Sequence, residues 1–400
     1  MSDTLSQLRN EIRKATYADE PELVRQLLEQ GALDKQGSEQ VRARAITLVE
    51  RCRGMSHKAG TLDAFLQEFG LSNNEGIALM CLAESLLRVP DEETADRLIA
   101  EKILSGDWAS HKGKSGSRFV NASVWGLMLT GRVVTLDEDI TGDTTSWMKK
   151  LVSSLGEPVV RRAVLQAMRI MGGQYVLGRS IEEAIQKGSS GNRPGTRFSF
   201  DMLGEGARTD KDAQRYFDSY AEAIRRIVAT DNGASVVQAN GISVKLSALH
   251  PRYQFRQKQR VMNELLPRVR ELALMAKQGR IGFSVDAEEC DRLDVSLDIF
   301  EALARDPELS GWDGLGFVLQ AYQKRATYVA RWLIDLARSA DRRFMVRLVK
   351  GAYWDGEIKH AQEQGMVDYP VFTRKCHTDV SYQACAAILL SAQDEVYPQF

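Results

Sequence analysis

Short apolar runs alternate with longer amphipathic segments over the second half of the chain. The runs are rich in β-branched and aromatic residues, and the segments between them repeat apolar positions at helical spacing. Strands that alternate with helices are typical of βα units and predict a parallel sheet. Six strands are predicted, near residues 197–203, 242–249, 281–286, 314–321, 343–351 and 396–400.

The first half of the chain shows only the helical period. Residues 1–55 and 56–176 place apolar side chains three and four positions apart among charges. A polar, Gly/Thr-rich stretch at 135–146 interrupts the second region, and a Gly-rich stretch at 187–196 follows it. We therefore expect a helical arm at 1–55, a helical linker domain at 56–176 and a barrel domain at 177–400. Helices as short as those of the arm cannot bury an apolar stripe alone, so the arm should pack on a neighbour or on a second subunit.

The glycines disfavour a dinucleotide-binding sheet. Neither Gly204–Gly206 nor Gly314–Gly316 has the third glycine of that fingerprint at the right offset. A closed barrel is the other common fold in which parallel strands alternate with helices. The fold class expected is α/β, a (β/α)8 TIM-type barrel that is incomplete at its C-terminus with about six strands, preceded by an all-α N-terminal region.

Composition and charge narrow the functional classes. The chain has 53 basic and 54 acidic residues, a net charge of −1, so we expect no nucleic-acid partner. Its five cysteines are scattered without a C-x-x-C pair, which disfavours a disulfide scaffold or a zinc ribbon and fits a reducing compartment. The charged N-terminus does not resemble a signal peptide, and no apolar run is long enough to span a bilayer. These features predict a cytoplasmic protein.

Polar residues stand at the ends of five successive predicted strands. In a TIM-type barrel the catalytic side chains lie at or just beyond the carboxyl ends of the strands. Lys245 should point into the barrel on the same face as Ser243 and Ser247, and Asp286 is placed to pair with it. The pattern alone leaves open both an active site and a set of solvated or paired structural charges. The strand-end residues are Asp201, Glu205, Lys245, Asp286, Gln320, Arg347, Lys350 and Tyr353.

Other candidate chemistry is weaker. The five histidines show no paired metal-binding spacing, and we expect no metal site. His250 stands in a turn before Pro251, where a structural role is expected. Cys290 and Cys385 are expected to be core or surface thiols.

The strand-end segments resemble, in order and at matching spacing, motifs of the proline dehydrogenase domain of the proline utilisation A (PutA) family. One such motif is weak evidence, but six in register are specific. Two helical stretches, EGIALMCLAESLLRVPD and FVNASVWGLMLTG, extend the resemblance over nearly the whole chain. The six motifs are FSFDMLGE, ISVKLSALHPRY, FSVDAEECDRLDVSLDIFE, GFVLQAYQKR, MVRLVKGAYWDGEIK and YPVFTRKCHTDVSY.

The resemblance implies FAD-dependent oxidation of L-proline to Δ1-pyrroline-5-carboxylate, in the front part of a bifunctional protein of proline catabolism. Lys245 and Asp286 match residues that line the proline site. Tyr353, with Ala352, matches the residue that packs on the proline ring. Glu205 matches a carboxylate that gates the site.

The resemblance also implies the residues that bind FAD. Gln320 and Arg347 match side chains that hydrogen-bond the flavin ring, with Arg347 near N5. A reduced flavin gathers negative charge, so a fixed cation and an amide donor there favour the product state. The matching turn at 373–375 receives the adenine-side phosphate and ribose. The remaining cofactor-binding residues implied are Asp286, Lys350, Gly351, Ala352, Trp354, Thr373, Arg374 and Lys375.

The chain departs from the family pattern at its ends, and two other interpretations stay open. It stops at Phe400, before the expected strands seven and eight and before the paired arginines that bind the proline carboxylate. It also lacks the ribbon-helix-helix segment of some members, so a repressor role is not expected. One alternative is a non-catalytic truncated fragment with a dimerising arm and no stable flavin site. Another is a different barrel enzyme that uses Lys245 as a Schiff base.

Partners are implied by the resemblance alone. A quinone should accept the electrons, and the protein could then associate peripherally with the inner face of the cell membrane. The arm should support a homo-oligomer.

Overall fold

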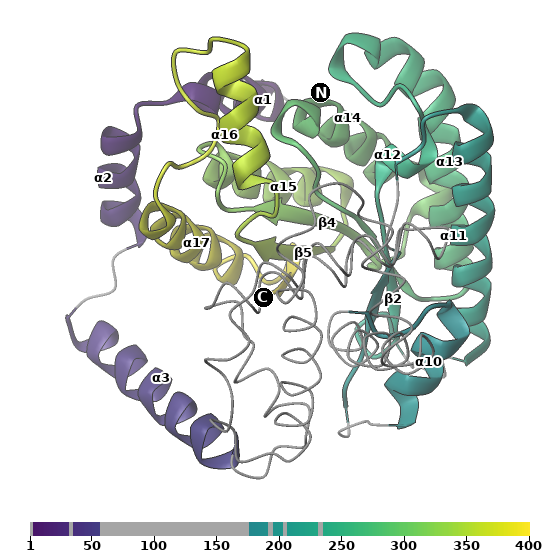
Figure 1. The fold of residues 1–400 in the computed structure, drawn as a ribbon, viewed down its shortest axis with the longest axis horizontal. Helices are drawn as coiled ribbons and strands as arrows, with labels where there is room; N and C mark the ends of the chain where they lie inside the picture. Colours follow the sequence, from purple (N-terminus) through teal and green to yellow (C-terminus); the bar gives the residue numbers. More distant parts are fainter. Residues whose placement is uncertain (1–2, 32–34, 57–175, 191–194, 203–205, 231–234) are drawn as a thin grey trace, which may run out of the picture. The chain divides into compact units, whose positions relative to one another are not determined.

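The computed structural model describes residues 3–31, 35–56, 176–190, 195–202, 206–230 and 235–400 (Figure 1). The helical linker domain expected at 56–176 lies almost wholly outside these residues. The chain divides into two compact units, one of residues 1–34 with 180–400 and the other of residues 35–179. The first unit holds the sheet and all the described candidate site residues.

The N-terminal residues form helices, as their periodicity predicts. They are α1 (Asp3–Lys14), the 3-10 turn η1 (Ala15–Tyr17), α2 (Glu20–Gly31) and α3 (Lys35–Ser56). Helix α1 contacts α15 and α2 contacts α17, so both pack on the barrel helices of the same chain. Leu5 and Ile12 are buried in the main core, and Leu23 and Leu27 pack in a smaller cluster with Phe372. Helix α3 belongs to the other unit.

Six parallel strands form one sheet in sequence order, which confirms the predicted strands and the α/β class. Sequential order with parallel pairing is the topology of a TIM-type barrel wall, where each strand is followed by a helix that returns the chain to the other end. The strands are β1 (Ser199–Asp201), β2 (Gly241–Val244), β3 (Gly282–Val285), β4 (Leu315–Gln320), β5 (Phe344–Val349) and β6 (Val396–Gln399).

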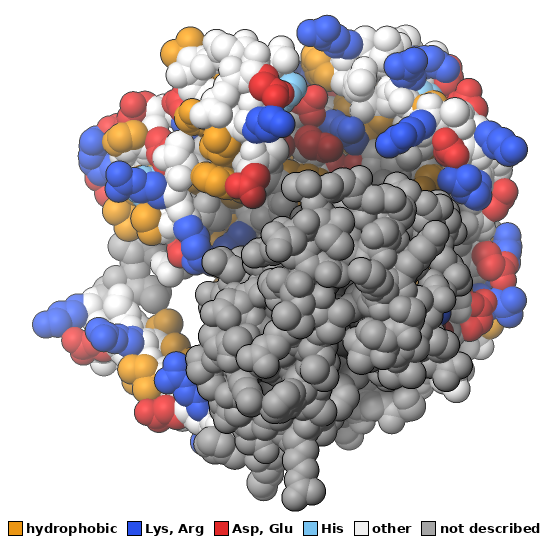
Figure 2. All heavy atoms as spheres, in the orientation of Figure 1, with side chains coloured by type: hydrophobic (Ala, Val, Ile, Leu, Met, Phe, Trp, Pro, Cys, Tyr) orange, Lys and Arg blue, Asp and Glu red, His pale blue; other side chains and the backbone are white. Residues whose placement is uncertain are grey.

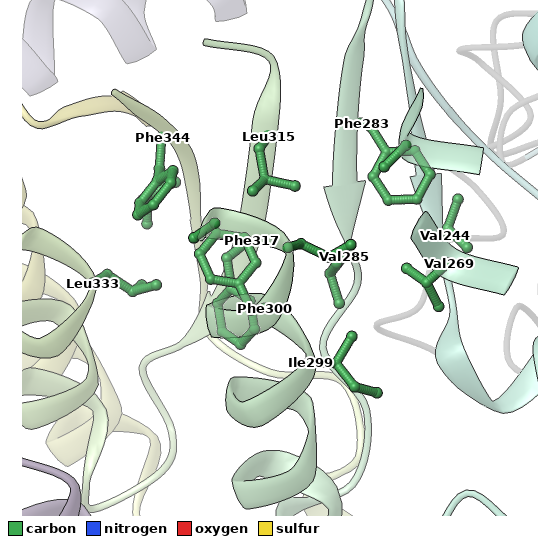
Figure 3. Packing of buried hydrophobic residues seen from close by; sticks show 14 of the residues in the cluster. Val244, Val269, Phe283, Val285, Ile299, Phe300, Leu315, Phe317, Leu333 and Phe344 are labelled. Atoms are coloured by element: carbon green, nitrogen blue, oxygen red, sulfur yellow. The ribbon is translucent and has the colours of Figure 1, made fainter. Parts of the chain in front are cut away.

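Helices cover the outer face of the sheet (Figure 1). Alternate strand residues such as Val244, Phe283 and Phe317 are large and apolar and pack against these helices, for example against Phe300 of α14 (Figure 3). The helices described after residue 180, including those at the rim, are α10 (Ile181–Ser190), α11 (Asp210–Thr230), α12 (Leu246–Leu249), α13 (Lys258–Gln278), α14 (Leu293–Ala304), α15 (Ala326–Ala340), α16 (Trp354–Glu363) and α17 (Lys375–Leu390), with 3-10 turns η3 (Phe255–Gln257), η4 (Cys290–Arg292) and η5 (Pro307–Leu309).

The second predicted strand, 242–249, is too long. Strand β2 ends at Val244 and the chain turns at once into α12. A period of two predicts that Ser247 shares a strand face with Ser243 and Lys245. This prediction is wrong, because Ser247 lies in α12. The short helix is stabilised because Leu246 and Leu249 are buried, and because the Ser247 N–H donates to the Glu288 carboxylate at 3.0 Å.

Charges of both signs are interspersed on the face drawn in Figure 2, as the balanced composition indicates. Among the helices that the structure describes, none is both long enough and apolar enough to cross a membrane.

Candidate active site

The concave side of the sheet is lined by small residues, and Arg347 crosses it. Arg347 of β5 donates from Nη2 to Ser199 Oγ of β1 at 2.6 Å, and its Nη1 lies 3.5 Å from Ser243 Oγ of β2. In a flat sheet, four strand spacings of about 4.8 Å would hold β1 and β5 about 19 Å apart. The sheet therefore curls strongly, as in a barrel wall. Glycine at 316 keeps this side open, because a Cβ there would lie 2.7 Å from Ser284 Oγ.

An ion network joins the carboxyl ends of the first three strands. Lys245, directly after β2, places Nζ 2.8 Å from Asp286 Oδ2 after β3, the pairing that the sequence predicts. It also lies 2.8 Å from Asp201 Oδ1, at the end of β1. The side chains of Lys245 and Asp286 are 11% and 16% exposed, whereas that of Asp201 is 38% exposed.

Lys245 is a fixed cation. Burial alone lowers the pKa of Lys245, but the charge of Asp286 and hydrogen bonds to Asp201 and Asp286 outweigh burial, so its pKa is raised. A lysine that acts as a nucleophile needs the opposite shift, toward the neutral amine. The geometry therefore gives no support to Lys245 as a Schiff base.

Tyr353 lies half-buried near this network. Its pKa is raised to about 12, mainly by burial and also by the charges of Glu288 and Glu289, while the charge of Lys245 opposes them. Glu288 is itself buried, which raises its pKa, and it accepts from the Ser247 N–H and pairs with Arg292 at 2.9 Å. Tyr353 thus presents a neutral hydroxyl beside charged groups.

The end of β4 carries a chain of buried polar side chains. Gln320 Oε1 accepts from Gln323 Nε2 at 2.7 Å, and Gln323 Oε1 accepts from Arg325 Nε at 2.9 Å. Arg325 also donates to the carbonyl of Cys290. The Cys290 side chain is buried, one of the two environments expected for it from the sequence. These bonds fix the orientation of the Gln320 amide at the rim.

The turn after β5 depends on a glycine. Gly351 has φ +132°, and a Cβ on it would lie 2.5 Å from ring carbons of Tyr322. Ala352 is exposed, and Trp354 donates from Nε1 to the Phe372 carbonyl at 2.8 Å. The turn is therefore held between Tyr322 and the segment that precedes α17.

A cluster of basic residues surrounds the N-terminus of α17. Lys350 and Lys375 both pair with Asp379, Lys375 at 3.1 Å. Arg374 is the exposed N-cap residue of α17 and makes no side-chain cap hydrogen bond. Thr373 donates from its N–H and its hydroxyl to Glu20 of α2, at 3.0 and 3.1 Å.

The structure brings most of the predicted site residues to one rim. Glu205 lies outside the described residues. His250 is a buried turn residue whose Nε2 lies 3.0 Å from Glu264 Oε2. The sequence predicts Asp201 only as a strand-end residue and not as a site residue, and the structure adds it as a second partner of Lys245. Sequence reasoning also did not identify Glu20, for which a helical arm gives no signal.

Comparison with known proteins identifies the family. A family model described as proline dehydrogenase matches residues 184–400. A model described as the proline utilization A proline dehydrogenase N-terminal domain matches 6–53, and one described as the DNA-binding domain of proline dehydrogenase matches 61–175. The absence of a nucleic-acid partner, expected from the net charge, is therefore not confirmed.

Curated relatives and solved structures agree with these models. The bifunctional protein PutA of Klebsiella aerogenes is 50% identical over 98% of this chain, and that of Escherichia coli K12 is also 50% identical over 98%. Proline dehydrogenase 1 of Bacillus subtilis is 26% identical over 60% of this chain and 68% of that protein. A crystal structure of Bradyrhizobium japonicum proline utilization A is 48% identical, with a TM-score of 0.69 over 96% of this chain and 38% of that one.

The chain spans 30% of the length of the PutA relatives that it matches. Proline dehydrogenases act on proline and are generally flavin-dependent. Because the proline dehydrogenase model covers more than half of the chain, the family is established. The chain belongs to the proline dehydrogenase family.

Proposed function

We propose that the chain is the N-terminal part of an FAD-dependent enzyme that oxidises L-proline to Δ1-pyrroline-5-carboxylate. The observation that best supports this function is the network of Lys245 with Asp201 and Asp286 at the rim, on the concave side that Arg347 crosses. A small zwitterion needs fixed charges of both signs beside an apolar or aromatic wall. The network supplies the charges, and Tyr353 and Ala352 supply the wall.

The donor set around the rim fits FAD. Arg347 and Gln320 are a cation and an oriented amide, suited to the charge that a reduced flavin ring gathers. Arg374 and Lys375 lie at the start of α17 and Lys350 pairs with Asp379 of the same helix, and a helix N-terminus favours phosphate. We assign the flavin ring to the first pair and the phosphates to the second group, with Asp286 and the turn at 351–354 between them.

The residues at the rim have different proposed roles in binding and oxidising proline. A bound flavin would supply the acceptor for the hydride that leaves the proline carbon next to nitrogen, while the ring nitrogen gives up a proton. Lys245 and Asp286 hold the charges of the amino acid without offering a nucleophile, and the neutral Tyr353 packs on its ring. Glu205 is proposed to gate the site.

The purified chain tests this function. It should show flavin absorbance at about 450 nm after addition of FAD, and L-proline should bleach that band in the absence of oxygen whereas D-proline should not. Arg347→Met should still bind FAD but be reduced about a hundredfold more slowly, because a fixed cation beside the developing charge is lost. A chain that stays colourless would support the alternative of a non-catalytic fragment.

Partners and boundaries complete the proposal. A quinone would accept the electrons, with peripheral association at a membrane, and the arm at 1–55 would support a homo-oligomer. The boundaries at 55 and 176 remain predictions. DNA is a second candidate partner because of the family model that matches 61–175, and fluorescence anisotropy with labelled duplex DNA would test it.

A further inference from the structure

The segment between α1 and α2 lies against two loops of the barrel rim. Lys324, after β4, is fully buried and donates from Nζ to the Ala18 carbonyl at 2.9 Å. Arg325 Nη1 lies 3.3 Å from Thr16 Oγ1. Glu20 contacts the other loop, just before α17. Residues 16–20 therefore touch the loop that follows β4 and the loop between α16 and α17, although the first barrel strand begins more than 150 residues later.

Glu20 is the most extensively bonded residue of this segment. Glu20 is buried, with 8% of its surface exposed. It accepts from Thr373 N at 3.0 Å and from Thr373 Oγ1 at 3.1 Å, and His377 Nδ1 lies 2.5 Å from its Oε1. Its carboxylate thus lies next to the N-terminal, positive end of α17, where it accepts from the N–H of Thr373, the residue just before the N-cap Arg374.

These bonds change the role of Thr373. Its N–H and its hydroxyl hydrogen are both used by Glu20. Thr373 therefore has no donor left for a cofactor phosphate, whereas the neighbouring side chains of Arg374 and Lys375 are exposed. Thr373 is the link through which Glu20 holds the turn that carries these two cations.

We propose that Glu20 is a positioning residue for the phosphate end of the flavin cofactor, acting through Thr373 and His377 on Arg374 and Lys375. The inference rests on the proposed function, which places the cofactor phosphates at this turn. It makes the N-terminal segment part of the cofactor site, although the proline dehydrogenase model begins at residue 184.

Flavins of different length test the proposal. FAD carries the pyrophosphate and adenosine, whereas riboflavin ends before them. Fluorescence titration of the full chain should show that Glu20→Gln lowers the affinity for FAD about tenfold, the loss expected when a charge-assisted contact is removed. The affinity for riboflavin should not change. Thr373→Val, which removes one of the two Thr373 donors, should give the same selective loss at about threefold. Glu29→Gln, on an exposed position of the same helix, should change neither affinity.

The outcomes separate this inference from the proposed function. If the unchanged chain binds neither flavin, the proposed flavin site is wrong and the inference falls with it. If the unchanged chain binds FAD and Glu20→Gln binds it equally well, only the inference is overturned. Equal weakening of FAD and riboflavin would also overturn it, because it would show that Glu20 merely supports the fold.

Discussion

Lys245 is held by two carboxylates of unequal exposure, and this inequality sets what each can contribute. Asp286 is mostly shielded from water, whereas Asp201 is 38% exposed. Ion pairs that are open to water contribute little free energy, because solvent screens the attraction between the charges. Asp286 should therefore matter more to the proposed proline site.

Substitution of each carboxylate by its amide tests this ranking. Asp286→Asn should lower the affinity for a non-oxidisable proline analogue about tenfold or more. Asp201→Asn should lower it less than about threefold, as expected for an exposed rather than a shielded pair. Binding is measured by calorimetry on the flavin-loaded chain. Equal losses, or a larger loss at Asp201, would contradict the assignment.

Tyr353 leads to a prediction about pH. Burial raises its pKa to about 12 from the ordinary value of 10.0. Between these values the folded chain keeps a proton that the unfolded chain loses, so Tyr353 contributes stability that falls as the pH rises from about 10 to about 12. Tyr353→Phe should lose less stability over that interval, as measured by urea unfolding. A Tyr353→Phe chain that is as sensitive to alkali as the unchanged one would show that Tyr353 titrates normally.

The turn at 350–354 is the element on which several proposed contacts depend. Its backbone needs a positive φ at Gly351, and the ring of Tyr322 fills the space where a Cβ would lie. Tyr322 is itself fixed by backbone bonds to Lys350 and Phe372. The turn therefore cannot shift without moving Tyr322, in the loop after β4, and the segment at Phe372, before α17.

Gly351→Ala should lower the free energy of unfolding by about 1–3 kcal/mol or more, because strain and a steric clash add. It should also weaken FAD. Gly356→Ala is the matched control, since a Cβ there meets nothing within 4 Å and the residue lies within α16. The control should stabilise the chain by about 0.5–1 kcal/mol. Thermal unfolding compares the two, and a Gly351→Ala chain as stable as the control would show that the turn is not constrained.

At the scale of the whole molecule, α1 and α2 are integral to the barrel unit. Four of their apolar side chains are buried against it: Leu5, Ile12, Leu23 and Leu27. Full burial contributes about 1.5–3 kcal/mol for each such residue. The total is comparable with the net stability of about 5–15 kcal/mol that a domain has.

Deletion of residues 1–31 should therefore abolish cooperative unfolding of the barrel unit, as followed by circular dichroism. Point variants give the control. Leu27→Ala, at a residue 2% exposed, should cost about 2–5 kcal/mol. Leu28→Ala, at a residue 51% exposed, should cost less than about 0.5 kcal/mol. A deleted chain that still unfolds cooperatively would show that the barrel stands alone.

The sequence by itself determined the six strands and their parallel pairing, because alternation of apolar runs and amphipathic helices is a local property. The missing dinucleotide fingerprint then favoured the sequential strand order of a barrel. The sequence also placed Lys245 and Asp286 at neighbouring strand ends, where they pair. Its error at 242–249 is local too, since Leu246 and Leu249 suit a buried strand and a buried helical turn alike.

Only the tertiary structure decided the contacts between distant segments. The curl of the sheet brings Arg347 to Ser199, and packing of α2 brings Glu20 to Thr373. Neither contact leaves a periodic trace in the sequence, because each depends on how whole elements pack rather than on the spacing of nearby residues. The strand-end rule locates the rim of this protein, and long-range packing determines which side chains meet there.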